Sequence, residues 1–152
     1  MKNTINIAVV GLGQIGIYLL NELETKKKDI YLKTGKNIKV VGVSAKNINK
    51  KRKFKFNKKI FFKNPLDIIN KKKVDILFEA IGLSDGISKK VVETALNNKI
   101  HVITPNKALI SKHGNNLAKL AEKNNVNLEF EASVAGGIPI LRSIKEGLTT
   151  NK

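Results

Sequence analysis

The sequence predicts an α/β protein built on a doubly wound parallel β-sheet with helices on both faces. Short apolar, β-branched runs alternate with amphipathic stretches along nearly the whole chain. Strands that are separated by helices pair in parallel through right-handed crossovers. The chain has 152 residues, of which 41% are hydrophobic, and this fits one ordinary domain with a core rather than two domains or a disordered chain.

Buried strands are expected where apolar residues run together without a helical period. The first reads Ile-Asn-Ile-Ala-Val-Val over residues 5–10 and stops at Gly11. The other expected strands are residues 38–43, 60–62, 74–80, 100–103 and 126–130. The one at 60–62 is short and follows a lysine-rich stretch, so we expect it at an edge of the sheet.

Helices are expected where apolar residues recur every three or four positions. Over residues 14–26 these are Ile15, Leu19, Leu20 and Leu23. The other expected helices are residues 65–70, 88–97, 117–123 and 139–148. Pro65 suits a first helical turn, with Asn64 as its cap. We expect loops at 27–36 and between Gly82 and Gly86, with His113 also in a loop and His101 at the end of a strand.

The formal net charge is +17, from 29 Lys and Arg against 12 Asp and Glu. Such a charge is typical of nucleic-acid-binding proteins. Only Arg52 and Arg142 are arginines, however, and arginine is favoured for bidentate phosphate and base contacts. Lys, Asn and Ile share A- and T-rich codons, so genome composition can produce this pattern. We therefore interpret the charge as a solvated surface and nucleic acid as an unfavoured partner.

One lysine-rich segment, KKRKFKFNKK at residues 50–59, keeps the nucleic-acid alternative open. Phe54 and Phe56 alternate with cations there, as base-stacking side chains do in single-strand-binding proteins. They equally suit an edge strand whose aromatic side chains face inward.

Several classes of protein are excluded by what the composition lacks. The sequence has no Cys, which rules out disulfides, thiolate metal sites and a cysteine nucleophile within it. No apolar run approaches the roughly 20 residues of a membrane span, and the first residues make a poor signal peptide. We expect a soluble, cytoplasmic protein without membrane contacts.

A glycine-rich loop follows the first expected strand and opens the first expected helix. It reads Gly11-Leu12-Gly13-Gln14-Ile15-Gly16, a complete G-x-G-x-x-G. Gly11 permits the tight turn, Gly13 lets the backbone approach a pyrophosphate, and Gly16 lets the helix pack closely on the strand. The helix N-terminus then holds the anion. This context favours a Rossmann-like dinucleotide site over a purely structural glycine turn.

The end of the second expected strand indicates which dinucleotide is bound. NAD-selective sites place Asp or Glu there to hold the ribose 2′-hydroxyl. Here the strand continues into Ser44-Ala45-Lys46-Asn47 without an acid. Lys46, with the basic residues at 50–52 nearby, can neutralise a 2′-phosphate, so NADP is favoured over NAD.

Two further blocks carry a family resemblance. Thr104-Pro105-Asn106-Lys107-Ala108 follows the strand at 100–103, and Glu-Ala-Ser-Val-Ala-Gly-Gly-Ile-Pro occupies residues 131–139. Together with the glycine loop and in the same order, they resemble homoserine dehydrogenase across nearly the whole chain. The resemblance implies a Rossmann domain and NAD(P)-linked interconversion of aspartate β-semialdehyde and homoserine, in threonine and methionine biosynthesis.

The resemblance also implies site residues. Lys107 would lie beside the nicotinamide and the substrate as a catalytic residue, where a cation can polarise a carbonyl. The implied cofactor-binding residues are Gly11, Leu12, Gly13, Gln14, Ile15, Gly16, Lys46, Gly82 and Lys107. The implied ligands of a monovalent cation such as sodium are Glu131, Val134, Gly136 and Ile138.

The resemblance finally sets the domain organisation that we expect. Residues 1–130 would form the NAD(P)-binding Rossmann domain, and 131–152 would begin the connection to a substrate and dimerisation domain. In this family that second domain supplies the remaining catalytic residues, and the full-length enzyme would be a homodimer. We therefore expect these 152 residues to be an N-terminal portion, inactive alone because hydride transfer needs both reactants held in attack geometry. The alternative in another class is a stand-alone NAD(P)-sensing module.

Overall fold

The computed structural model describes residues 3–50 and 56–130. Within these residues, six strands form one sheet in the order β3-β2-β1-β4-β5-β6, and every neighbouring pair is parallel. The strands are β1 (Thr4–Val10), β2 (Asn37–Ser44), β3 (Phe61–Phe62), β4 (Ile76–Glu79), β5 (His101–Ile103) and β6 (Leu128–Glu129). The six expected strands are thus present, some of them shorter than predicted.

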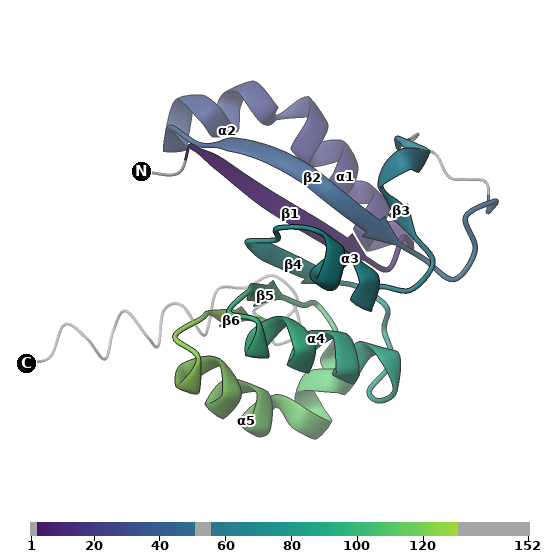
Figure 1. Ribbon diagram of the computed structural model, residues 1–152, viewed down its shortest axis with the longest axis vertical. Coiled ribbons are helices and arrows are strands. Elements are labelled where there is room, and N and C mark those ends of the chain that lie inside the picture. The colour runs from purple at the N-terminus through teal and green to yellow at the C-terminus, as the bar shows by residue number, and fades with distance from the viewer. Residues whose placement is uncertain (1–2, 51–55, 131–152) are drawn as a thin grey trace, which may run out of the picture.

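Helices lie on both faces of this sheet, as Figure 1 shows. They are α1 (Gln14–Thr25), α2 (Lys27–Thr34), α3 (Leu66–Lys71), α4 (Ile87–Asn97) and α5 (Lys107–Lys123), with a 3-10 turn η1 (Lys58–Ile60) before β3. Helices α1 and α2 cover one face near β1 and β2, and α3, α4 and α5 cover the other. The predicted fold class is confirmed.

The core divides into two clusters because successive residues of a strand point to opposite faces. In β1, Ile7 and Val9 pack with Leu20 of α1 on one side. Ala8 and Val10 pack on the other side in a larger cluster with residues of α3, α4 and α5. Val9 and Ala8 are both fully buried, so β1 is the centre of the molecule.

The chain reverses its direction of travel across the sheet at β1. From β1 the chain first moves outward through β2 to β3, and β4 then returns to the other side of β1. In open α/β sheets, ligands bind outside the carboxyl ends of the strands at such a switch point. The topology therefore places a site beyond the ends of β1, β2 and β4.

The prediction of a loop over 27–36 is wrong, because residues 27–34 form α2. This helix buries none of its residues, so it lacks the apolar period by which helices are recognised in a sequence. Its stability is local: Asp29 lies in its first turn, Lys33 in its last, and Gly35 ends it in the left-handed conformation at φ 65°.

The helix expected at 117–123 begins ten residues earlier, since α5 starts at Lys107. The side chain of Asn106 caps it by accepting a hydrogen bond from the Leu109 N–H at 3.1 Å. His113 is consequently helical, and the prediction that it lies in a loop is wrong. The helix expected at 139–148 lies outside the described residues.

Helix α3 begins at Leu66, directly after Pro65, and the side-chain oxygen of Asn64 caps it as predicted by accepting from the Leu66 N–H at 3.1 Å. The lysine-rich segment is described only from Phe56 onward, so Phe54 lies outside the described residues. Phe56 stacks on Phe61 with ring centroids 6.3 Å apart and packs against the core cluster on the α1 side. Phe56 therefore faces inward, as the second alternative predicts, but the predicted edge strand is wrong for the described residues, because 56 and 57 lie in no strand and 58–60 form η1.

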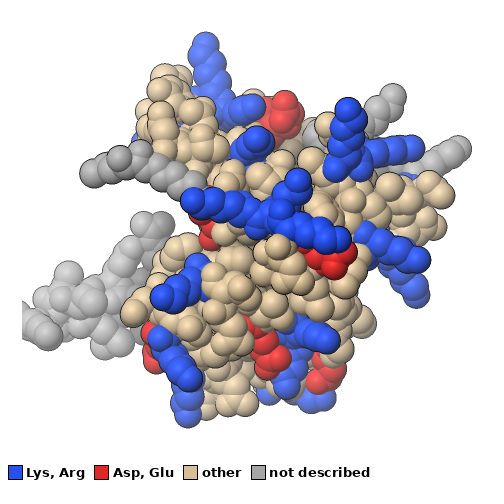
Figure 2. All heavy atoms as spheres, viewed as in Figure 1, with Lys and Arg blue, Asp and Glu red and all other residues tan. Residues whose placement is uncertain are grey.

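Lysine side chains of the described residues spread over the face in view in Figure 2, with acidic side chains between them. This spread agrees with a solvated surface charge. None of the helices in the described part of the chain is long and apolar enough to span a bilayer.

Candidate cofactor-binding site

The glycine loop turns the chain sharply at the carboxyl end of β1. Gly11 has φ +94°, a conformation that side chains rarely allow, and its N–H donates to the Ser44 carbonyl at 2.9 Å. A Cβ at this position would lie 2.3 Å from the carbonyl carbon and oxygen of Ala80. Gly11 is therefore required for β1 to turn between the ends of β2 and β4.

The two other glycines of the motif differ in what surrounds them. Gly16 is buried, and a Cβ on it would lie 2.0 Å from the Gly11 carbonyl oxygen. Gly13 is exposed at φ −78°, and a Cβ on it would meet no atom within 4 Å. Gly11 and Gly16 thus serve the fold, whereas Gly13 keeps space open in front of the helix.

The N-terminus of α1 faces this space. No side chain caps it, and its first turn holds no acidic residue. The first backbone N–H groups of a helix have no partner within the helix, and they stand at the positive end of its dipole. Such an end binds phosphate groups readily. Gln14 and Ile15, in this first turn, are exposed beside Gly13.

A cleft of about 1000 Å³ opens at the same place. The ends of β1, β2 and β4 contribute to its lining, together with the starts of α3 and α4. The lining residues are Val10, Gly11, Leu12, Gly13, Ser44, Ala45, Lys46, Asn47, Lys50, Lys63, Pro65, Ala80, Ile81, Leu83 and Ile87. The cleft is large enough for an extended dinucleotide, and it lies at the topological switch point.

Three lysines line one end of this cleft. Lys46 and Lys50 follow β2, and Lys63 follows β3. All three are exposed. Lys63 was not anticipated from the sequence, because only the β2–β3 pairing, Val43 with Phe61 and Ser44 with Phe62, brings it beside the residues that follow β2.

Lys107 lies at the same edge of the sheet, beyond β5. It is exposed and is the first residue of α5, directly after the capping Asn106. It is not among the residues that line the cleft, and neither is Gly82, whose φ of +88° bends the loop after β4. Both belong to segments that border the cleft on its β4 side, because Asn106 Nδ2 donates to the Leu83 carbonyl at 2.8 Å.

A buried acid lies beneath the loop after β4 and the start of α5, and the sequence did not indicate its role. Glu79, the last residue of β4, is fully buried and accepts from Ile81 N–H at 2.8 Å and Thr104 Oγ1 at 2.6 Å. Ser88 Oγ and Asn106 Nδ2 complete its partners at 3.0 and 3.4 Å. Its partners lie up to 27 residues away in the sequence, so no local pattern indicates them.

A second polar cluster fixes the other end of the same loop. The Asp85 carboxylate lies 2.7 Å from Lys112 Nζ and 2.9 Å from His113 Nε2, both on α5. Hydrogen bonds from Lys112, then Ser84 and then His113 hold the pKa of Asp85 well below its ordinary value. His113, which lacked a visible partner in the sequence, therefore has one in the fold.

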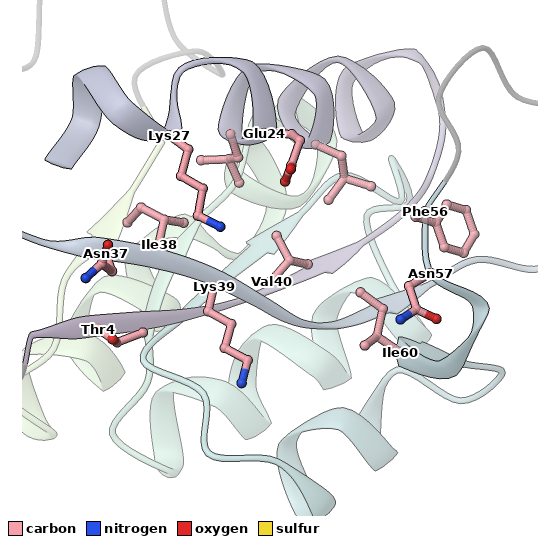
Figure 3. A pocket seen from close by; sticks show the side chains of 12 residues that line it. Thr4, Glu24, Lys27, Asn37, Ile38, Lys39, Val40, Phe56, Asn57 and Ile60 are labelled. Atoms are coloured by element: carbon pink, nitrogen blue, oxygen red, sulfur yellow. The ribbon is translucent and has the colours of Figure 1, made fainter.

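A second hollow lies on the α1 and α2 face of the sheet, away from the glycine loop. It encloses about 680 Å³, and Ile38, Val40 and Ile60 are among its apolar lining. Figure 3 shows Glu24 and Lys27 at its helical side. It contains none of the residues that the sequence predicted for the site.

The cation ligands expected at Glu131, Val134, Gly136 and Ile138 lie outside the described residues. Within residues 3–50 and 56–130, no group of three or more His, Cys, Asp or Glu side chains is arranged to hold a metal ion.

The sheet order, the glycine turn and the switch-point cleft together define a dinucleotide-binding domain of the Rossmann type. The sequence profile described as "Homoserine dehydrogenase, NAD binding domain" matches residues 11–131. The chain therefore belongs to the homoserine dehydrogenase NAD-binding domain family.

Relatives and solved structures agree with this family. The chain is 36% identical over 148 residues to a homoserine dehydrogenase of Neisseria gonorrhoeae, covering 97% of this chain and 34% of that protein. The corresponding protein of Bacillus subtilis is 33% identical over the same shares. A homoserine dehydrogenase structure from Thiobacillus denitrificans superposes with a TM-score of 0.83 at 33% identity, over 97% of this chain and 34% of that one. The chain thus spans about a third of the length of these relatives.

Proposed function

We propose that this chain is the cofactor-binding part of an NAD(P)-dependent oxidoreductase that interconverts aspartate β-semialdehyde and homoserine. The observation that carries the proposal is the uncapped N-terminus of α1, which faces a cleft at the switch point across Gly13. Family membership supports the choice of reaction.

The residues present fit a nicotinamide dinucleotide. The pyrophosphate would lie over Gly13 and receive hydrogen bonds from the first turn of α1. The adenosine ribose would reach the end of β2, and the nicotinamide would lie toward the loop after β4. When bound, the cofactor supplies or accepts a hydride, and the chain's own residues orient it and exclude water around it.

NADP is the proposed form of the cofactor. No acidic side chain lines the cleft near the end of β2, within the part of the chain that the structure describes. Lys46, Lys50 and Lys63 line it instead, and cations there favour a 2′-phosphate over a 2′-hydroxyl.

Lys107 is the proposed catalytic residue of this chain. It is exposed at the start of α5, in a segment that borders the β4 side of the cleft, where the nicotinamide would lie. A cation beside the reacting carbonyl stabilises the negative charge that develops on oxygen as the hydride arrives.

Two further features of the proposal, the cation and the dimer, rest on the resemblance in the sequence alone. Glu131, Val134, Gly136 and Ile138 would bind a monovalent cation such as sodium. The complete enzyme would be a cytoplasmic homodimer. Nucleic acid is not a proposed partner, since the lysines interleave with acids on the surface in view in Figure 2.

A chimeric enzyme tests the activity. This chain would be joined to the remaining two thirds of its Neisseria gonorrhoeae relative, and NADPH oxidation would be measured with aspartate β-semialdehyde. We expect turnover, and we expect Lys107→Met to lower kcat by about a hundredfold. Lys119→Met, an exposed lysine on the same helix, is the matched control and should leave kcat unchanged.

The same experiment separates the alternatives. A folded chimera that binds NADPH but does not oxidise it would favour the sensing module. Equal effects of Lys107→Met and Lys119→Met on kcat would contradict the role given to Lys107.

A further inference from the structure

Glu79 is a buried acid to which the proposed cofactor contacts assign no role. Its side chain is fully buried, although it is a carboxyl group at the end of an apolar strand. Burying such a group is costly unless hydrogen bonds replace its hydration. Four donors surround it, from Ile81, Ser88, Thr104 and Asn106.

Three of these four hydrogen bonds require Glu79 to act as the acceptor, and the fourth partner, the Ser88 hydroxyl, is able to donate to it. The Ile81 N–H and Asn106 Nδ2 can only donate. The Thr104 hydroxyl accepts from the Asn106 N–H at 3.1 Å, so its own proton points to Glu79 Oε2 at 2.6 Å. A carboxylate satisfies every one of these donors, whereas an amide at the same place would turn an NH₂ group toward them.

These bonds join the two segments that border the β4 side of the cleft. Ile81 belongs to the loop after β4 and lines the cleft directly. Asn106 caps α5, and its side chain also bonds to the Leu83 carbonyl in the same loop. Lys107 follows Asn106 in the chain, so a shift of Asn106 moves both Leu83 and Lys107.

We propose that Glu79 is a positioning residue for the nicotinamide end of the site, acting through Ile81 and through the Thr104–Asn106 pair that begins α5. This inference rests on the proposed function, because it presumes that a nicotinamide cofactor occupies the cleft. Glu79 touches neither cofactor nor substrate in this account. The adenosine end, formed by the glycine loop and the end of β2, does not depend on it.

The test compares two ligands that differ only in the nicotinamide. NADPH and 2′-phospho-ADP-ribose would be titrated calorimetrically into the 152-residue protein and into Thr104→Val, which deletes the hydroxyl but keeps the shape. We expect NADPH to bind about tenfold more weakly to Thr104→Val while 2′-phospho-ADP-ribose binds with unchanged affinity. Thr94→Val is the matched control, because the Thr94 hydroxyl bonds to the Lys90 carbonyl within α4, and this variant should bind both ligands normally.

Glu79→Gln provides the stronger variant, and its folding would be checked by urea denaturation. If it folds, we expect a larger loss of NADPH affinity than in Thr104→Val, again with unchanged affinity for 2′-phospho-ADP-ribose. Equal losses for the two ligands, or no loss for either in Thr104→Val, would overturn the positioning role. Failure of the unmodified protein to bind either ligand would overturn the proposed function itself, and the inference with it.

Discussion

Two similar substitutions in the glycine loop should have different effects: Gly16→Ala should lower the free energy of unfolding, and Gly13→Ala should lower the affinity for NADPH. In Gly16→Ala, the new methyl group would lie 2.0 Å from the Gly11 carbonyl oxygen. Since real contacts of this kind are essentially never shorter than 3.0 Å, the start of α1 and the glycine turn must separate by about 1 Å. Overpacking of this size costs about 1–3 kcal/mol, against about 1 kcal/mol gained from replacing glycine by alanine in a helix.

In Gly13→Ala, the new methyl group meets no protein atom within 4 Å, and φ −78° suits any residue. The free energy of unfolding should therefore stay the same or rise by up to about 1 kcal/mol. The methyl group would, however, occupy the place proposed for the pyrophosphate. Losing one or two charge-assisted hydrogen bonds there should weaken NADPH binding by about 10- to 100-fold.

Urea denaturation measures the first effect and calorimetric titration with NADPH the second. The expected pattern is a stable Gly13→Ala protein that binds poorly and a destabilised Gly16→Ala protein. Normal NADPH affinity in Gly13→Ala would refute the assignment of the pyrophosphate to this loop.

Three further predictions concern charge and packing. The double substitution Lys46→Ala and Lys63→Ala should weaken the binding of NADPH about tenfold more than the binding of NADH, in paired titrations at one salt concentration. An unchanged ratio of NADPH affinity to NADH affinity would remove the basis for the proposed NADP preference. The pKa of Asp85 is lower in the folded state than its ordinary value of 3.8, so its ion pairs stabilise the fold at pH values above 3.8. That stabilisation is lost as the pH falls from 3.8 through the pKa of the folded state. The stability difference between the unmodified protein and Asp85→Asn should therefore shrink as denaturation is measured at successively lower pH below about 4, and a difference that grows would contradict this. Leu77→Ala, at a fully buried position of β4, should cost about 2–5 kcal/mol of unfolding free energy, with a smaller loss arguing against the packing described.

The strands of the sheet could be predicted from the sequence because each of them is marked by a short apolar run of neighbouring residues. β1 is an apolar run whose second half is buried on both faces, and β4 is a short apolar run that is buried on one face and half-buried on the other. The G-x-G-x-x-G marks the turn between β1 and α1. The helix α2 could not be predicted in this way, since it buries nothing and is held by local capping.

The start of α5 was missed for a different reason. Gly114 and the two asparagines after it are typical of a loop, yet they continue a helix whose first turn is fixed by Asn106. That residue is in turn fixed by Glu79 from another strand. Pairing between distant segments decides such positions, and a single sequence does not reveal it.

The residues of the candidate site also fall into two groups: those that local sequence indicates and those that only contacts between distant segments bring to the site. The glycine loop and Lys46 could be predicted because each directly follows a strand that is recognisable in the sequence. Lys63 reaches the cleft only through the β2–β3 pairing, and Asp85 meets His113 only through the packing of α5 beside α4. Glu79 looks like an isolated acid in the sequence, and only the fold shows its partners.

The central claim is that a nicotinamide dinucleotide binds across the glycine loop at the switch point. Titration of the isotopically labelled 152-residue protein with NADPH, followed by amide NMR shifts, tests it most directly. We expect the largest shifts at residues 11–16, 44–47 and 80–83, around the cleft. Shifts confined to the hollow of Figure 3, around Ile38, Val40 and Ile60, or no shifts at all, would contradict the account.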